Sequence, residues 1–139
     1  MKTILIVDDD RKSAAGLTIR LKAAGYRVLS AADGIEGLKL AIQHQPDLIV
    51  MDIWMPFGIG ILTAQRLKHI GLASVPVIFV TASRKQDLWA IVEEVEPAGF
   101  FEKPYDAKAL AGTIEMLLAQ AGPVPVAAKA LRASQACAL

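Results

Sequence analysis

The chain has 139 residues, a formal net charge of +1 and a single cysteine, Cys137. Its length indicates one domain, and no apolar stretch approaches the roughly 20 residues that a membrane-spanning helix needs. One cysteine excludes an internal disulfide, and the start of the chain lacks a signal-peptide pattern, so we expect a cytoplasmic protein. Lysine and arginine are scattered, which predicts binding neither to nucleic acid nor to a membrane surface.

Short apolar runs alternate along the chain with segments in which apolar residues recur at helical spacing. The runs have the length and composition of strands that are buried on both faces. Strands are predicted at residues 4–7, 26–30, 48–51, 77–80 and 99–102, and helical stripes run from Leu17 to Ala24, Ile35 to Ile42, Ile61 to Ile70, Leu88 to Val95 and Leu110 to Leu118. Five strand–helix repeats predict an α/β fold, a (βα)5 doubly wound parallel sheet with helices on both faces.

Local signals mark the ends of these helices. Asp10 has the position and side chain of an N-cap for the first helix, a role that we prefer for it over that of a metal ligand. Gly25 and Gly71 would end the first and third helices, and Pro46 and Pro97 would stop the second and fourth.

Residues 122–139 form an Ala- and Pro-rich tail, which leaves residues 1–121 as the domain. A Pro-Val-Pro segment breaks the fifth helix, and the alanines after it favour a short extra helix. An isolated helix of this length is marginal, so two interpretations stay open. The tail is either a frayed end or a segment whose Val126, Ala130 and Leu131 dock on the domain or on a partner.

Four of the apolar runs end in polar residues of different chemical kinds. These are Asp8–Asp10 after the first run, Asp52 after the third, Thr81 after the fourth and Lys103 after the fifth. In open parallel sheets, ligands bind at the rim formed by the carboxyl ends of the strands. That rim would hold several carboxylates, a hydroxyl and an ammonium, a set suited to a divalent metal and a phosphoryl group.

Each of these side chains has a predicted role. Oxygen-only donors favour a hard cation, and Mg²⁺ takes one or two carboxylates and keeps several waters, so Asp8, Asp9 and Asp52 are candidate ligands. Asp52 is also the candidate nucleophile, because a carboxylate can form an aspartyl-phosphate. Lys103 would act as a point charge on one phosphoryl oxygen, and Thr81 would donate a hydrogen bond to another.

At these residues the chain resembles the receiver domain of two-component response regulators, most of all its single-domain, chemotaxis-regulator kind. The likeness covers roughly residues 2–121. Its motifs are the acidic cluster at 7–10, the phosphoacceptor segment at 51–56, Gly60 at the start of the third helix, Thr81 with its small neighbour Ala82, and Lys103 before Pro104. The resemblance implies a flavodoxin-like fold with strand order 2-1-3-4-5 and a cis bond before Pro104.

The resemblance also implies a phosphorelay receiver that binds Mg²⁺. Asp9 would be a direct metal ligand, Asp8 would act largely through water, and the carbonyl of Trp54 would bind the metal as well. Asp52 would accept a phosphoryl group from a sensor histidine kinase or a phosphotransfer protein. Such a domain is no enzyme beyond catalysing its own phosphorylation and dephosphorylation, for which Asp52, Thr81 and Lys103 are the expected catalytic residues.

Two switch residues follow from the same resemblance. Thr81 would move toward the phosphoryl group, and Phe100, at the aromatic position of the fifth strand, would turn inward. The face made by the fourth helix, the fifth strand and the fifth helix would then change and meet an unknown downstream protein. A homodimer through this face or through the tail is left open.

Three positions depart from the family's common pattern. Ile59 stands where an aspartate usually precedes the glycine, and Phe100 replaces the commoner tyrosine. Trp54 is bulky beside the phosphorylation site, where we expect it to shield the acyl phosphate from water.

Three other functions fit these residues less well than that of a receiver. A metal-dependent phosphatase with an aspartyl nucleophile would need a second acid where Trp54 stands. An FMN-binding domain would need a hydroxyl-rich loop where this chain has three aspartates. The main alternative is a degenerate receiver that serves as a phosphorylation-independent protein-interaction module, although the acids, the hydroxyl and the lysine are all present.

Overall fold

The structure is a computed structural model that describes residues 1–55, 58–72, 74–81 and 96–121; the side chains of residues 54–61 and 120–121 lie outside this description. The elements in chain order are β1 (Thr3–Val7), α1 (Arg11–Ala23), β2 (Arg27–Ala31), α2 (Gly34–His44), β3 (Leu48–Asp52), β4 (Trp54–Met55), β5 (Gly58–Ile59), α3 (Gly60–His69), β6 (Val77–Thr81), β7 (Gly99–Glu102) and α5 (Ala107–Ala121). The predicted fourth helix, around Leu88 to Val95, and the tail 122–139 fall outside the described residues.

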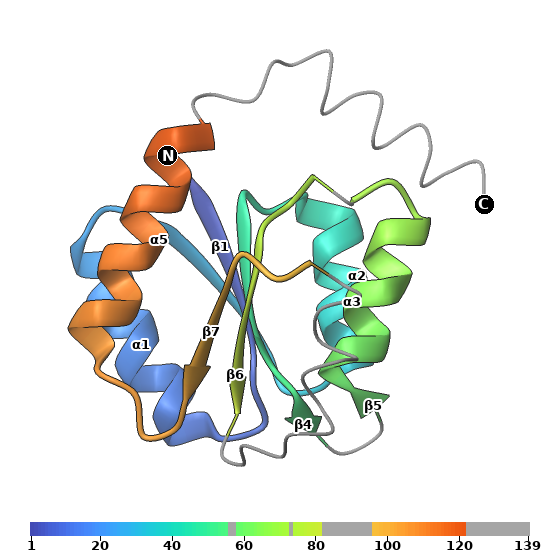
Figure 1. Cartoon of the computed structure of the whole chain (residues 1–139), viewed down its shortest axis with the longest axis horizontal. Coiled ribbons are helices and arrows are strands. Elements are labelled where there is room, and N and C mark those ends of the chain that lie inside the picture. Colours follow the sequence, from blue (N-terminus) through green and yellow to red (C-terminus); the bar gives the residue numbers. More distant parts are fainter. Residues whose placement is uncertain (56–57, 73, 82–95, 122–139) are drawn as a thin grey trace.

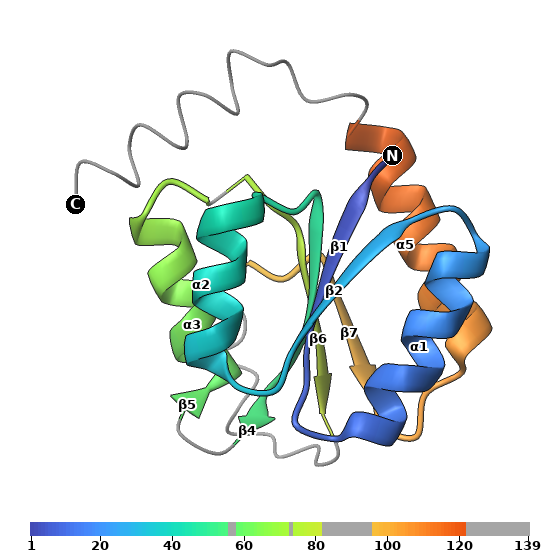
Figure 2. The same cartoon turned by 180° about the vertical axis from the view of Figure 1, so that it is seen from behind.

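Five strands form one parallel sheet in the order β2-β1-β3-β6-β7. Counted among these five strands, this order is 2-1-3-4-5, so the predicted doubly wound, flavodoxin-like sheet is confirmed. Helices α1 and α5 cover one face of the sheet, and α2 and α3 cover the other (Figures 1 and 2). Among the described residues, no helix is both long and apolar enough to cross a membrane.

The burial of the strands explains their sequence. Every residue of β3 is buried, as are four of the five in β1, because helices pack on both sides of these central strands. The edge strand β2 is less buried, with two exposed, two partly buried and one buried residue, which agrees with its less apolar sequence. Alternate side chains of each central strand enter two separate hydrophobic clusters, one under each helical layer.

The predicted ends of the first and third helices are confirmed. The Asp10 side chain accepts hydrogen bonds from the backbone N–H groups of Lys12 and Ser13, so Asp10 is the N-cap of α1. Gly25 has φ +96° and Gly71 has φ +87°, backbone conformations that glycine adopts without strain. The peptide bond between Lys103 and Pro104 is cis, as the family resemblance implied.

The buried side of helix α2 differs from the one that the apolar residues from Ile35 to Ile42 predicted. Its buried positions are Gly34, Gly37 and Ala41, whereas Ile35 and Ile42 are 55% and 43% exposed. A Cβ atom on Gly37 would lie 2.8 Å from Cγ2 of Val7, so the glycine lets the helix lie directly on β1. The isoleucines were therefore wrong as markers of the buried side of this helix.

A short antiparallel pair, β4 with β5, was not predicted at all. Trp54 pairs with Ile59 and Met55 pairs with Gly58, immediately after the end of β3. Two-residue strands are too short to show any periodicity in sequence. The pair lies at the carboxyl-end rim of the main sheet, between β3 and α3 (Figure 1).

We predict that Gly37→Ala destabilises the domain by about 1–3 kcal/mol, because the new methyl group overlaps a stiff, β-branched side chain in a packed core. The matched control is Gly112→Ala in α5, where a Cβ would meet no atom within 4 Å. That substitution should leave stability unchanged or raise it by up to about 1 kcal/mol through helix propensity. Urea unfolding of both variants measures the difference, and equal stabilities would show that α2 does not rest tightly on β1.

Candidate functional site

The structure brings the predicted polar residues to one rim of the sheet. Asp8 directly follows β1, Asp52 is the last residue of β3, Thr81 is the last residue of β6, and Lys103 directly follows β7. Because all five strands are parallel, their carboxyl ends share this rim.

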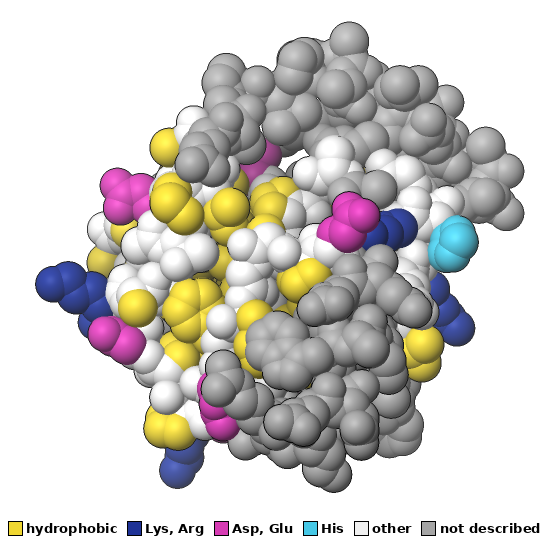
Figure 3. All heavy atoms as spheres, in the orientation of Figure 1, with side chains coloured by type: hydrophobic (Ala, Val, Ile, Leu, Met, Phe, Trp, Pro, Cys, Tyr) yellow, Lys and Arg dark blue, Asp and Glu magenta, His cyan; other side chains and the backbone are white. Residues whose placement is uncertain are grey.

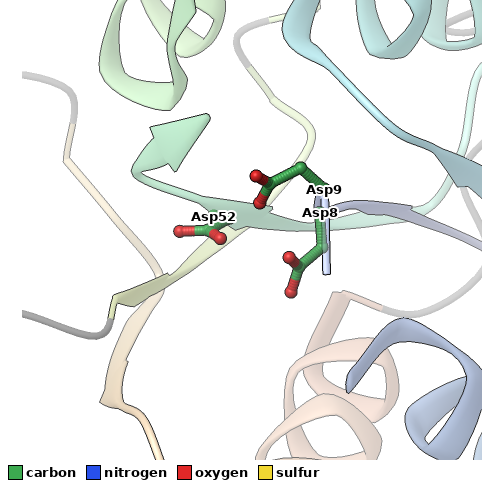
Figure 4. A group of neighbouring side chains, drawn as sticks. All are labelled: Asp8, Asp9 and Asp52. Carbon is green, nitrogen blue, oxygen red and sulfur yellow. The ribbon is translucent and has the colours of Figure 1, made fainter. Parts of the chain in front are cut away.

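Three carboxylates gather at the centre of the rim. Oxygen atoms of Asp8, Asp9 and Asp52 lie within 4.8 Å of one another, and Figure 4 shows the three side chains extending from the ends of neighbouring strands. Asp8 and Asp52 are each only 5% exposed, while Asp9 is exposed. The cluster therefore has a buried base and one carboxylate open to solvent.

Lys103 lies between the two buried acids. Its Nζ donates to Oδ2 of Asp8 at 2.9 Å and to Oδ2 of Asp52 at 3.2 Å, and the lysine side chain is 16% exposed. The other oxygen of Asp8 accepts the backbone N–H of Asp10 at 2.9 Å. Asp8 is thus fixed at both oxygens, once by a loop amide and once by the ammonium.

Partial burial lowers the pKa of the Lys103 ammonium, but the hydrogen bonds and negative charges of Asp8 and Asp52 more than offset this effect. The net result is a pKa above the ordinary value of 10.5. Lys103 therefore remains positively charged throughout the physiological pH range.

Thr81 lies on the strand next to Asp52. In the sheet register Asp52 is opposite Val80, so Thr81 is one residue further along the neighbouring strand. Thr81 is completely buried, and its carbonyl accepts the backbone N–H of Lys103 at 2.6 Å. The hydroxyl-bearing residue and the lysine are therefore connected through the backbone as well as sharing the rim.

Two other predicted site residues, Phe100 and Trp54, lie in β7 and β4. Phe100 is opposite Phe79 in the sheet and is partly buried against the cluster under α2 and α3. Trp54 begins β4, two residues after Asp52; its side chain and that of Ile59 lie outside the described residues. The metal and switch roles of these residues stay predictions.

The pairing of Lys103 with Asp8 was not foreseen. The two residues are 95 positions apart in sequence, and no local pattern connects them. The only signal was that both follow an apolar run, which predicts a common rim but not a hydrogen bond.

The donor set fits a hard divalent cation. Three ionised carboxylates against one ammonium leave a formal charge of −2 in a site whose base is buried. Like charges about 4 Å apart repel by roughly 4 kcal/mol at the effective dielectric of a protein surface. A cation bound by oxygen atoms would relieve this repulsion, and Mg²⁺ prefers such ligands.

We expect that Lys103→Met lowers the free energy of unfolding by roughly 1.5–3 kcal/mol at pH 7, since it leaves two buried carboxylates without their cation. A lysine whose pKa is higher in the folded state than in the unfolded state stabilises the fold fully at any pH below the unfolded-state pKa. This stabilisation is lost as the pH rises through the folded-state pKa. The wild-type advantage should therefore stay constant from pH 7 to pH 9 and shrink above about 10.5.

The control for this measurement is Lys108→Met, which removes an exposed lysine from the first turn of α5. Its unfolding free energy should stay within about 0.5 kcal/mol of the wild type. Two results would contradict the shared ion pair. One is a decrease in unfolding free energy for Lys103→Met that is no larger than that for Lys108→Met, and the other is a decrease that disappears below pH 9.

The sequence matches the response regulator receiver domain over residues 4–115. Among curated relatives, the DNA-binding dual master transcriptional regulator RpaA of Synechocystis is 36% identical over 93% of this chain and 54% of its own length. Protein PilH of Pseudomonas aeruginosa is also 36% identical, over 86% of this chain and 99% of its own length. The chain thus spans about half of the first relative and nearly all of the second.

A solved structure agrees with this match. The chemotaxis protein CheY4 of Vibrio cholerae superposes with a TM-score of 0.79 at 27% identity, and the overlap covers 85% of this chain and 99% of that one. Fold, rim chemistry and sequence therefore lead to one conclusion. The chain belongs to the response regulator receiver domain family of two-component signal transduction.

Proposed function

We propose that this chain accepts a phosphoryl group on Asp52 from a sensor histidine kinase or a phosphotransfer protein. The observation that carries the proposal is the position of Asp52. Its carboxylate ends the central strand β3, lies within 4.8 Å of two other carboxylates and is 3.2 Å from the Lys103 ammonium. A nucleophile beside a metal-binding cluster and a fixed cation has what phosphoryl transfer needs, namely positioning and charge stabilisation.

In this reaction an Asp52 carboxylate oxygen attacks the phosphorus of the donor's phosphohistidine. The new bond is P–O, the bond that breaks is P–N, and the electron pair of the broken bond stays on the imidazole nitrogen. Lys103 is already 3.2 Å from Asp52, so its ammonium can balance charge on a phosphoryl oxygen without a large movement. Thr81, buried one residue beyond the level of Asp52, supplies a hydroxyl for another oxygen.

Asp8, Asp9 and Asp52 are the side chains that would hold Mg²⁺, together with the carbonyl of Trp54. The ion supplies positive charge that lowers the repulsion between Asp52 and the incoming phosphoryl oxygens. The exposed position of Asp9 suits a ligand for an ion that keeps several waters. Asp8 already accepts two hydrogen bonds, which suits contact through a metal-bound water.

The output surface would be the face made by the fourth helix, β7 and α5. Phosphorylation would draw Thr81 toward the phosphoryl group and turn Phe100 further inward, a two-state change biased by local charge. Figure 3 shows hydrophobic side chains on the described part of this face, over β7 and α5, and Met116 of α5 is 52% exposed. A downstream protein or a second copy of the chain would bind there.

The test is incubation with Mg²⁺ and a small acyl phosphate, followed by intact mass measurement. Wild type should gain about 80 Da, the mass of a phosphoryl group that replaces a proton, and Asp52→Asn should gain nothing. Asp33→Asn is the control, because asparagine caps a helix as well as the aspartate that caps α2, so its adduct should persist. The absence of an adduct on wild type would favour a phosphorylation-independent interaction module instead, and an adduct on Asp52→Asn would assign the phosphoryl group to another residue.

A further inference from the structure

Large hydrophobic side chains are exposed on the outer surface of α2 and α3. Ile35 and Ile42 of α2 are 55% and 43% exposed, and Leu62 of α3 is 54% exposed. Neither the sheet core nor the phosphorylation site accounts for them. Exposed apolar side chains are ordinary when they are scattered singly, whereas a contiguous apolar patch is characteristic of a binding surface.

The spacing of these residues makes two ridges. Ile35, Lys39 and Ile42 follow one another at i, i+4 and i+7 on α2, and Leu62, Arg66 and His69 do the same on α3. Residues at this spacing share one face of a helix, and all six are exposed. The α2 ridge therefore presents two isoleucines beside Lys39, and the α3 ridge presents one leucine beside Arg66.

The two ridges lie on neighbouring helices. Figures 1 and 2 both show α2 and α3 side by side on the same face of the sheet. A Cβ atom on Gly34 would collide with Oγ1 of Thr63, so the helices touch at this glycine. Thr63 is buried at this contact. Ile35 and Leu62 are the chain neighbours of the two contacting residues, so each ridge begins beside the contact.

Charge on this surface is positive. In the described part of the chain neither Lys39 nor Arg66 forms an ion pair, and α3 contains no acidic residue. The one carboxylate of α2, Glu36, accepts the backbone N–H of Ala32 at 3.1 Å. An occupant would therefore need apolar side chains flanked by carboxylates.

We propose that the α2–α3 surface docks an amphipathic, acidic helix of another protein. Helices that bind between two helices place apolar anchors along one face, and the exposed Ile35, Ile42 and Leu62 would receive them. Carboxylates on the same helix would pair with Lys39 and Arg66, which gives the contact its orientation and its partner preference.

Other occupants fit the charges less well. A second copy has no suitable helix among those described, since α1 and α3 contain no acid and α2 and α5 contain one each. The tail 122–139 contains Lys129 and Arg132 and no acidic residue. Anionic membrane binding calls for clusters of about four to eight basic residues, more than this surface offers.

The probe is a dye-labelled synthetic helix with leucines at i, i+3, i+4 and i+7 and glutamates on both flanks, measured by fluorescence anisotropy against the full chain. Saturable binding is expected, and Ile42→Ser should weaken it at least about tenfold. Ile35→Ser is the second variant should the first misfold. Ile19→Ser, which removes an α1 side chain that is 71% exposed, should bind as wild type does.

Charge reversal adds an independent arm. The double substitution Lys39→Glu with Arg66→Glu should abolish binding of the glutamate-flanked helix and allow binding of a lysine-flanked version of the same helix. The proposal is overturned if binding of the probe does not saturate, if Ile19→Ser and Ile42→Ser weaken that binding equally, or if wild type binds the lysine-flanked helix more tightly. Binding to phosphatidylserine vesicles, or self-association, that is lost in Ile42→Ser would assign the surface to a membrane or a second copy instead.

Discussion

Two buried carboxylates, Asp8 and Asp52, would repel each other at the rim of the sheet if the Lys103 ammonium did not lie between them. The lysine follows β7 at one edge of the sheet, whereas the acids follow β1 and β3 near its centre. Its position depends on the backbone bond from Lys103 N–H to the carbonyl of Thr81, which joins β7 to β6. The charge balance of the site thus depends on the order of four neighbouring strands.

This dependence connects the fold to the chemistry. Asp8 and Asp52 stay buried because helices cover both faces of the central strands, and burial strengthens their interaction with Lys103 and with any bound cation. Asp9, exposed on the same loop, leaves the cluster open to water and to a phosphoryl donor. A negative, partly open cluster with one fixed cation would suit a metal ion and, beside it, a phosphoryl group.

Much of the fold could be predicted from sequence because the central strands are buried on both faces and so appear as continuous apolar runs. Asp10 as a cap and Gly25 as a helix end could be predicted because capping acts over a few residues. The buried side of α2 could not, since Gly34 and Gly37 have no side chain that would mark it as apolar. Nor could the β4–β5 pair, which is too short to show a period.

The candidate site was predictable as a rim but not as a bonded network. An apolar run followed by a polar residue indicates where a strand ends, and parallel strands place those ends together. Which oxygen of Asp8 bonds to Lys103 and which to the amide of Asp10 depends on the packing of loops that are far apart in sequence.

We propose that the carboxylates of the rim form a cation site of which Asp9 is the open ligand. Thermal unfolding of wild type and Asp9→Asn, with and without Mg²⁺, tests this proposal. Binding to the folded state alone stabilises it by about 1.4 kcal/mol at ten times the dissociation constant. We predict a rise in Tm with Mg²⁺ for wild type that is largely lost in Asp9→Asn. A wild-type Tm that does not respond to Mg²⁺, or an equal rise in both proteins, would show that Asp9 is not a ligand of a cation at this rim.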